Sequence, residues 1–309
     1  MRVGLVANPR SSKDIRRLTS LARVIDIEEK ANLVARLLVG IGAERDVEVM
    51  ALDDDAGLVR RAVMLAGIAG APVRYLAIEA EGTESDTRIA ATRLAEEGAA
   101  ALVTVGGDGT VRAAAEGWSR APLVPLAAGT NNAFALTEEP TVVGLATALA
   151  VKGDLDAFKP TTAVEVETAS GRAVAVIDAI AVRDRWVGAG AIWDPDRLVE
   201  GLVTSSRRTA VGIASVSAAL GPLAEGHARH LQFGGDRRVR AVFGPGVVLD
   251  VAVGEHADLP VGSEVALDES SGLVALDGER LLTARLGVAR VVAGPRIIDL
   301  ERALGGFRP

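Results

Sequence analysis

The stretch that decides the fold is ALVTVGGDGTVRAAAEGW, residues 101–118. An apolar run typical of a buried strand, 101–105, leads directly into the glycine turn GGDGT at residues 106–110, and a segment with helical periodicity follows. A chain that turns sharply from a strand into a helix presents unpaired backbone N–H groups and the positive end of the helix dipole. The sequence therefore predicts a site for a phosphate group at this turn.

Asp108 is the informative residue of the turn, because a carboxylate repels phosphate and would otherwise be a poor neighbour for it. Its presence indicates that it faces a magnesium ion or an acceptor hydroxyl. Asp-Gly is also a common turn dipeptide, so an ordinary surface turn remains the alternative on these five residues alone. The pattern is neither a Walker loop, which needs Lys followed by Ser or Thr, nor a dinucleotide fingerprint, whose third glycine is replaced by Arg112.

The first half of the chain alternates β-rich runs with helical patterns, which predicts an α/β domain with a parallel sheet. We expect strands at 3–7, 46–51, 73–78, 101–105 and 123–126, and helices at 27–41, from Ser85 or Asp86 to Glu97, and at 141–151. Two further polar turns follow predicted strands, at Asn8–Lys13 and Gly129–Asn132. Ligands in open α/β sheets bind beyond the carboxyl ends of the strands, so the three turns are expected to face one cleft.

The second half changes to alternating residues punctuated by turns, which predicts a predominantly antiparallel β domain. We expect a hairpin from 163–168 and 173–182, strands at 239–253, 264–267, 274–276 and 281–286, and one helix at 209–220. The expected domains are residues 1–145, α/β and nucleotide-binding, and residues 146–294, β-rich and acceptor-binding. The tail 295–309 is expected to pack back on the first domain.

Composition narrows the classes of function. A chain of 309 residues exceeds what one compact core usually accommodates, and its net charge of −7 argues against a nucleic-acid partner. The absence of cysteine excludes disulfides and thiolate metal sites. The N-terminal MRVGLVANP reads as a strand rather than a signal segment, and no apolar stretch reaches the length of a membrane span, so a cytoplasmic location is expected.

The three turns, an Asn-Pro turn, then GGDGT, then a GTNN-type turn, resemble in this order the superfamily of NAD kinases, diacylglycerol kinases and sphingosine kinases. Within it, the sequence resembles the acetoin catabolism protein X-like family in ANPRSSKDIRRL (7–18), GTNNAFAL (129–136) followed by EPTVVGLATAL (139–149), and DRWVGAGAIWDP (184–195). The resemblance covers nearly the full chain. It implies an N-terminal α/β domain with a parallel sheet, a C-terminal antiparallel β domain and a nucleotide cleft between them.

The resemblance also implies an ATP-dependent kinase that uses Mg²⁺ and transfers the γ-phosphoryl group to a hydroxyl, with the 2′-OH of the adenosine ribose of NAD as the expected acceptor. Asp108 would orient or deprotonate that hydroxyl. Asp178 and Asp277 would contact the acceptor; Asp277 lies in Leu276–Glu279, which is similar to an Asp-Gly-Glu element of lipid kinases and is equally a plain hairpin turn. No direct motif for metal ligands is present. The residues implied for nucleotide binding are Asn8, Pro9, Arg10, Lys13, Gly106, Gly107, Gly109, Thr110, Gly129, Thr130, Asn131 and Asn132.

Two other functions stay open. The GTNN and Asp-Gly-Glu-like turns also suit a lipid kinase of the diacylglycerol or sphingosine type, although the acidic chain shows no obvious membrane-docking surface. A nucleotide-binding regulator without turnover is the non-enzymatic alternative.

Related kinases usually form dimers or tetramers, so a homo-oligomer is expected. Several arginines could contact phosphate, although charged solvent-facing surfaces explain them at least as well: Arg207, Arg208, Arg237, Arg238 and Arg240.

Overall fold

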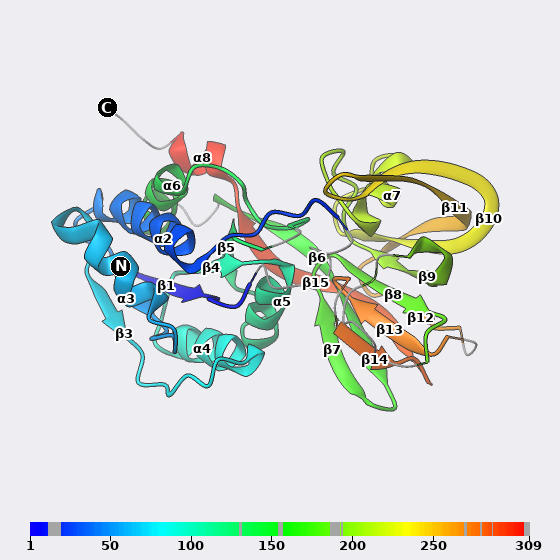
Figure 1. Ribbon diagram of the computed structural model, residues 1–309, viewed down its shortest axis with the longest axis horizontal. Coiled ribbons are helices and arrows are strands. Elements are labelled where there is room, and N and C mark those ends of the chain that lie inside the picture. The colour runs from blue at the N-terminus through cyan, green and yellow to red at the C-terminus, as the bar shows by residue number, and fades with distance from the viewer. Residues whose placement is uncertain are drawn as a thin grey trace.

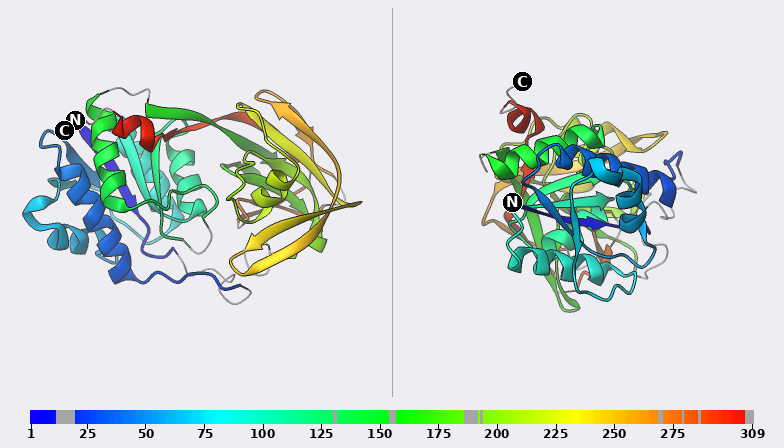
Figure 2. Two further views of the ribbon diagram at one scale, coloured as in Figure 1. Left: turned by 90° about the horizontal axis from the view of Figure 1, so that it is seen from above. Right: turned by 90° about the vertical axis from the view of Figure 1, so that its left-hand side faces the viewer.

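The computed structural model describes residues 1–11, 20–129, 132–153, 157–185, 192, 194–268, 271–278, 280–285 and 287–305. It consists of an α/β body and a β-rich body, which lie side by side along the longest axis (Figure 1). Strands β6 and β15 run from one body into the other, as the two further views also show (Figure 2). The predicted fold class, a parallel α/β domain followed by an antiparallel β domain, is confirmed.

The α/β body alternates strands and helices along the chain. Its elements are β1 (Arg2–Ala7), α2 (Ile27–Gly42), β2 (Glu48–Ala51), α3 (Leu58–Ala66), the 3₁₀ turn η1 (Gly67–Ala69), β3 (Val73–Tyr75), α4 (Glu84–Glu96), β4 (Ala101–Gly106), α5 (Asp108–Gly117), β5 (Pro122–Ala127) and α6 (Pro140–Lys152). The strands pair in parallel in the order β3-β2-β1-β4-β5. This is a doubly wound sheet.

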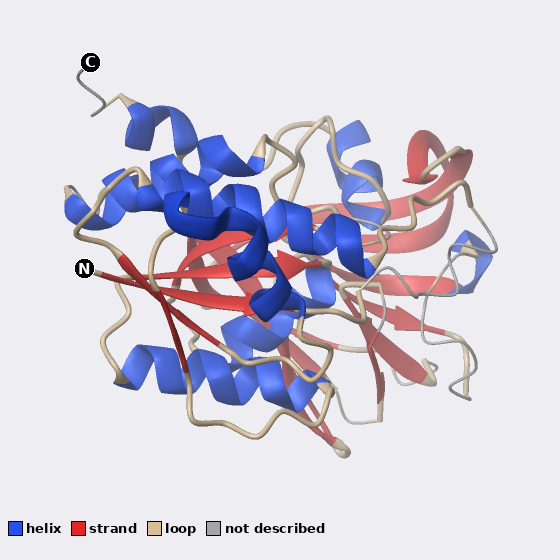
Figure 3. Ribbon diagram, turned by 60° about the vertical axis from the view of Figure 1, so that its left-hand side comes forward, coloured by secondary structure: helices blue, strands red, loops and turns tan. Residues whose placement is uncertain are grey.

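Helices cover both faces of the parallel sheet (Figure 3). One face packs on α2, α3 and α6 through a core that includes Leu5, Leu37 and Val143. The other face packs on α4 and α5 through Val6, Leu94 and Val111. The adjacent residues Leu5 and Val6 point to opposite faces because side chains alternate along a strand, and a strand buried on both faces is therefore almost wholly apolar.

Helix α4 begins earlier than the sequence suggested. Its N-cap is Thr83 rather than Ser85 or Asp86, and Asp86 is the third helical residue of a capping box. The Asp86 carboxylate accepts hydrogen bonds from the backbone N–H groups of Gly82 at 2.6 Å and Thr83 at 2.9 Å. A carboxylate at this position satisfies the N–H groups ahead of the helix. The predicted N-cap, Ser85 or Asp86, therefore lies two or three positions after the observed one.

The β-rich body adds strands to the first sheet and builds a second one. Its elements are β6 (Phe158–Thr168), β7 (Gly171–Ala175), β8 (Asp178–Val182), the 3₁₀ turn η3 (Pro195–Arg197), β9 (Leu198–Val203), α7 (Ile213–Ala219), β10 (His227–Gly244), β11 (Val247–Pro260), β12 (Glu264–Ala266), β13 (Leu273–Leu276), β14 (Arg280–Thr283), β15 (Val288–Ile298) and α8 (Leu300–Leu304). The second sheet is antiparallel, in the order β11-β10-β9-β8-β13-β14.

The predicted hairpin of 163–168 and 173–182 is wrong in its second half. Strands β6 and β7 form a hairpin in the first sheet, but the chain then leaves that sheet and enters the second as β8, between β9 and β13. The N–H groups of Val176 and Ile177, at the crossing, donate to the carboxylate of Asp277 instead of to a strand. That carboxylate comes from a distant part of the chain, so the apolar run alone gave no sign of the break.

The end of the chain returns to the first body. Strand β15 pairs antiparallel with β6, and its residues Arg296 and Ile297 pair in parallel with Pro122 and Leu123 of β5. Ala303 of α8 is buried in the same core as α2 and α6. Among the described residues, none of the helices is long and apolar enough to cross a bilayer.

Candidate active site

The site lies where the parallel sheet reverses its strand order. From β1 the chain proceeds outward to β2 and β3, whereas β4 returns to the opposite side of β1. The strand order therefore reverses between β1 and β4, and ligands of open α/β sheets bind beyond the carboxyl ends of the strands at such a point. Asn8 follows β1 here: its backbone N–H donates to the Val105 carbonyl at 2.8 Å, and its side-chain amide donates to Thr110 Oγ1 at 3.0 Å.

The glycine turn has the geometry that the sequence predicted. Strand β4 ends at Gly106, Gly107 caps α5, and the helix begins at Asp108. The Gly107 carbonyl accepts the Thr110 N–H at 2.9 Å, and a Cβ atom on Gly106 would lie only 2.3 Å from Thr110 Oγ1. The turn thus needs glycine for space, and it stands at the start of a helix, where the first N–H groups have no partners within the helix.

The backbone of the second turn, Gly129–Asn132, contacts the backbone of the glycine turn. A Cβ atom on Gly129 would lie 2.5 Å from the Cα atom of Gly107, and the Ala128 N–H donates to the Gly106 carbonyl at 2.8 Å. Asn132 closes the turn on itself, because its side chain accepts from the Gly129 N–H at 3.1 Å and donates to the Gly129 carbonyl at 3.0 Å. Thr130 and Asn131 lie outside the described residues.

Asp108 joins the same two turns through its side chain. It is 8% exposed; Oδ2 accepts the N–H of Ala133 at 2.9 Å and Oδ1 accepts that of Phe134 at 3.1 Å. A carboxylate oxygen has two lone pairs and can accept more than one donor. The Asp108 side chain therefore fixes the second turn and lies at the start of α5 at the same time.

The Asn-Pro turn is held by a residue that sequence reasoning missed. Lys30 of α2 is 1% exposed, and its ammonium group donates to the carbonyls of Pro9 at 2.9 Å and Ser11 at 2.6 Å. Ser11 Oγ in turn donates to the Ala128 carbonyl at 2.8 Å. The sequence feature that could have indicated this role is the position of Lys30 on the apolar face of a helix, one turn before the buried Val34.

Arg10 lies at the rim of this turn. Its backbone N–H donates to the side chain of Asn8 at 2.8 Å, its guanidinium forms an ion pair with Asp55 at 2.7 Å, and it also donates to the Gly82 carbonyl. These contacts tie together the loops after β1, β2 and β3 at one edge of the sheet. Lys13 lies outside the described residues.

The two acidic residues predicted to contact the acceptor lie in the β-rich body, and both are buried. Asp277 has a φ of 50°, and its Oδ1 accepts the N–H groups of Val176 at 3.0 Å, Ile177 at 2.8 Å and Asp178 at 3.3 Å. Asp178 returns a bond, because its carbonyl accepts the Asp277 N–H at 2.8 Å. Their contact with an acceptor stays a prediction.

Burial raises the pKa of Asp277 to about 6, against the opposing effect of the Arg112 guanidinium and the backbone N–H groups of Val176 and Ile177, and the Asp108 charge raises this pKa further. Arg112, one helical turn after Asp108 in α5, is the second residue that sequence reasoning missed. It is 3% exposed, donates to the Leu276 carbonyl at 3.2 Å and lies 3.8 Å from Asp277. The only sequence signal was an arginine at helical spacing from Asp108.

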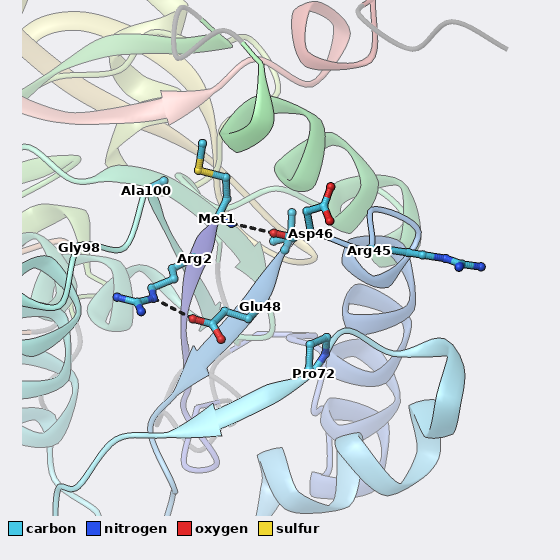
Figure 4. Close-up of a pocket in the computed structure, with 9 residues that line it drawn as sticks. Met1, Arg2, Arg45, Asp46, Glu48, Pro72, Gly98 and Ala100 are labelled. Atoms are coloured by element: carbon cyan, nitrogen blue, oxygen red, sulfur yellow. Dashed lines mark hydrogen bonds and ion pairs between the residues drawn. The ribbon is translucent and has the colours of Figure 1, made fainter.

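A cavity of about 600 Å³ lies elsewhere, at the opposite edge of the parallel sheet. Met1, Arg2, Asp46, Glu48 and Gly98 are among its lining residues (Figure 4). The N-terminal ammonium donates to the Asp46 carbonyl at 2.7 Å, and Arg2 pairs with Glu48 at 2.7 Å. These groups stand at the amino ends of the strands, away from the three turns, so we do not assign the chemistry to this cavity.

Comparisons with known proteins agree with the fold. A model of the ATP-NAD kinase N-terminal domain matches residues 3–154, and a model of the acetoin catabolism protein X C-terminal domain matches residues 162–292. Acetoin catabolism protein X of Cupriavidus necator is 32% identical over 302 residues, which cover 91% of this chain and 84% of the relative. A crystal structure of a diacylglycerol kinase from Bacillus anthracis is 10% identical, covers 96% of both chains and has a TM-score of 0.45.

The fold and the three turns define a protein of the NAD kinase-like class, which supports a phosphotransferase of the kinase type. The chain belongs to the acetoin catabolism protein X family.

Proposed function

We propose that this protein transfers the γ-phosphoryl group of Mg-ATP to a hydroxyl group, and that the acceptor is the 2′-OH of the adenosine ribose of NAD. The observation that carries the proposal is the contact between Gly107 and Gly129 beside the carboxylate of Asp108. The N-terminus of α5 beside two closely packed glycine turns is the kind of place where backbone N–H groups bind phosphate oxygens. Asp108 is the reactive group at its edge.

The residues also fit Mg²⁺. In the part of the chain that the structure describes, no three acidic or histidine side chains gather as a metal site. Magnesium is commonly bound by one or two carboxylates together with substrate phosphates, so Asp108 would hold it together with the nucleotide phosphates. When bound, Mg²⁺ would neutralise charge on the phosphate oxygens.

The transfer breaks the bond between the γ-phosphorus and its bridging oxygen to the β-phosphate, and it forms a bond from the acceptor oxygen to the γ-phosphorus. Asp108 orients the acceptor hydroxyl and takes its proton late, because an ordinary carboxylate is a much weaker base than an alkoxide. Asn8 and the N–H groups of the glycine turn hold the nucleotide. Most of the rate enhancement then comes from alignment and from neutralisation of charge.

One acceptor panel tests the proposal. The purified protein is incubated with Mg-ATP and with NAD, NADH, diacylglycerol or a sphingosine-like lipid in vesicles, and phosphorylated product is quantified. Product from NAD or NADH alone supports the proposal. Product from a lipid alone replaces it with the lipid kinase alternative, and saturable ATP binding without product from any acceptor replaces it with a nucleotide-binding regulator.

A further inference from the structure

The loop after β9 brings one arginine of the second body to the proposed phosphate site. Arg207 is exposed, and its guanidinium donates a hydrogen bond to the carbonyl of Ala133. The N–H of the same Ala133 donates to Asp108 Oδ2 at 2.9 Å. The Ala133 carbonyl shares its peptide unit with the Phe134 N–H, which donates to Asp108 Oδ1 at 3.1 Å. One peptide unit just after the second turn therefore connects Arg207 with the carboxylate proposed to bind the acceptor hydroxyl.

Hydrogen bonds hold this loop in place. The N–H of Thr204 donates to the Ile177 carbonyl at 2.8 Å, and Thr204 Oγ1 donates to the Val176 carbonyl at 2.9 Å. Within the loop, the Arg207 carbonyl accepts the Ala210 N–H at 2.9 Å. Because Val176 and Ile177 are the residues that Asp277 binds, the loop is attached to the crossing between the two sheets.

The charge of Arg207 is available to a ligand. Across the described residues, no carboxylate forms an ion pair with Arg207, whereas Arg240, another of the arginines considered from the sequence, pairs with Asp250 at 2.9 Å. Arg208 is also exposed, but within the same described ranges it makes no hydrogen bond or ion pair with either turn. The structure thus distinguishes Arg207 from Arg208 and Arg240, which the sequence did not.

We propose that Arg207 is the cation that the second body contributes to the transferring phosphoryl group. This inference rests on the phosphotransferase function proposed above. As the bond to the bridging oxygen breaks, negative charge grows on that oxygen of the departing ADP and spreads over the three equatorial oxygens of the phosphoryl group. A guanidinium group suits these oxygens because it donates several hydrogen bonds in a plane.

The experiment compares the full chain with its variants Arg207→Met, Arg207→Lys and Arg208→Met, using Mg-ATP and the acceptor that the wild type phosphorylates. For Arg207→Met we expect kcat to fall about a hundredfold or more, as for the loss of one preorganised donor, while the Kd for ATP changes by less than about tenfold. Arg207→Lys keeps the charge but loses the planar donors, so it should recover part of kcat. Arg208→Met should keep kcat within about twofold, since surface substitutions change little.

The split between kcat and ATP binding separates a role at the phosphoryl group from a merely structural one, because misfolding would weaken both. A kcat for Arg207→Met within about threefold of wild type overturns this inference alone. The same holds if Arg208→Met loses as much kcat as Arg207→Met. Absence of transfer by the wild type to every acceptor in the panel overturns the proposed function, and this inference with it.

Discussion

The two ends of the strands in the parallel sheet, called here the carboxyl edge and the amino edge, carry different polar groups. At the carboxyl edge, Gly107 touches Gly129, and the carboxylate of Asp108 accepts two backbone N–H groups. At the amino edge lies the cavity of about 600 Å³, where the side chains of the ion pair Arg2–Glu48 remain 50% and 40% exposed. The cavity lies at the amino ends of the strands, whereas the buried carboxylate and the contact between the two glycine turns lie at the carboxyl ends. If the proposed site is correct, oriented polar groups rather than open volume distinguish it.

The strongest test of this contrast removes the charge at the carboxyl edge. In Asp108→Asn, we expect turnover to fall by roughly a hundredfold or more, because an amide cannot accept the hydroxyl proton. Steady-state kinetics with Mg-ATP and the productive acceptor measure the effect, and circular dichroism checks that the fold persists. Asp250→Asn is the matched control, since it breaks only the exposed pair with Arg240. Unchanged turnover in Asp108→Asn would remove Asp108 from the proposed mechanism.

The buried carboxylate beside this edge should impose a pH dependence on stability. The pKa of Asp277 is raised to about 6, so its ionisation is disfavoured in the folded chain. The contribution of Asp277 to stability is then greatest below its ordinary pKa and is lost as the pH rises through about 6.

Asp277→Asn removes this titration while it keeps an oxygen acceptor for the N–H groups of residues 176–178, and asparagine tolerates the positive φ. Relative to wild type, the free energy of unfolding of the variant should therefore increase by about 2 kcal/mol between roughly pH 4 and pH 7.5. Urea denaturation at both pH values measures it. A difference that is the same at both pH values would show that Asp277 titrates normally.

Glycine substitutions at the two ends of the strands should affect different properties, ATP binding at the carboxyl ends and stability alone at the amino ends. In Gly129→Ala the new Cβ would lie 2.5 Å from the Gly107 Cα, so the two turns must separate, and we expect the Kd for ATP to rise about tenfold or more. Gly98, which lines the cavity, has a φ of 76°, and a Cβ atom added to it would meet open space. Gly98→Ala should cost about 1 kcal/mol of stability and leave ATP binding unchanged. Calorimetric titration with ATP, together with urea denaturation, separates the two outcomes.

The sequence was sufficient where neighbours in the chain determine the structure. The glycine turn at 106–110 was predictable because its strand, its glycines and its helix are contiguous, and the strand order then placed Asn8 beside Thr110. The sequence was insufficient where distant residues determine the structure. Arg112 reaches the carbonyl of Leu276 across 164 positions, and the break between β7 and β8 depends on Asp277, 100 positions from Ile177. Such contacts leave no local pattern.

The buried charged residues of the site were not found from the sequence, because their partners also lie elsewhere in the chain. Lys30 stands in a segment whose periodicity predicts an ordinary amphipathic helix, and a lysine near the apolar face is usually read as reaching toward solvent. Its ammonium instead binds the carbonyls of Pro9 and Ser11, which belong to the preceding turn. Burial of a charged group is costly without such partners, so an unexpected lysine on a buried face is itself a reason to look for them.

The smallest effect is expected at the amino edge. Arg2→Ala removes the ion pair with Glu48 and a hydrogen bond to the Glu97 carbonyl at 3.1 Å. Because the pair is half exposed, water screens it, and we expect a loss of less than about 1 kcal/mol in the free energy of unfolding that shrinks further at high salt. ATP binding should not change, since the residue lies at the far ends of the strands that carry the three turns. If Arg2→Ala weakened ATP binding as much as Gly129→Ala, the cavity would have to be counted as part of the nucleotide site, and the distinction between the two edges would fail.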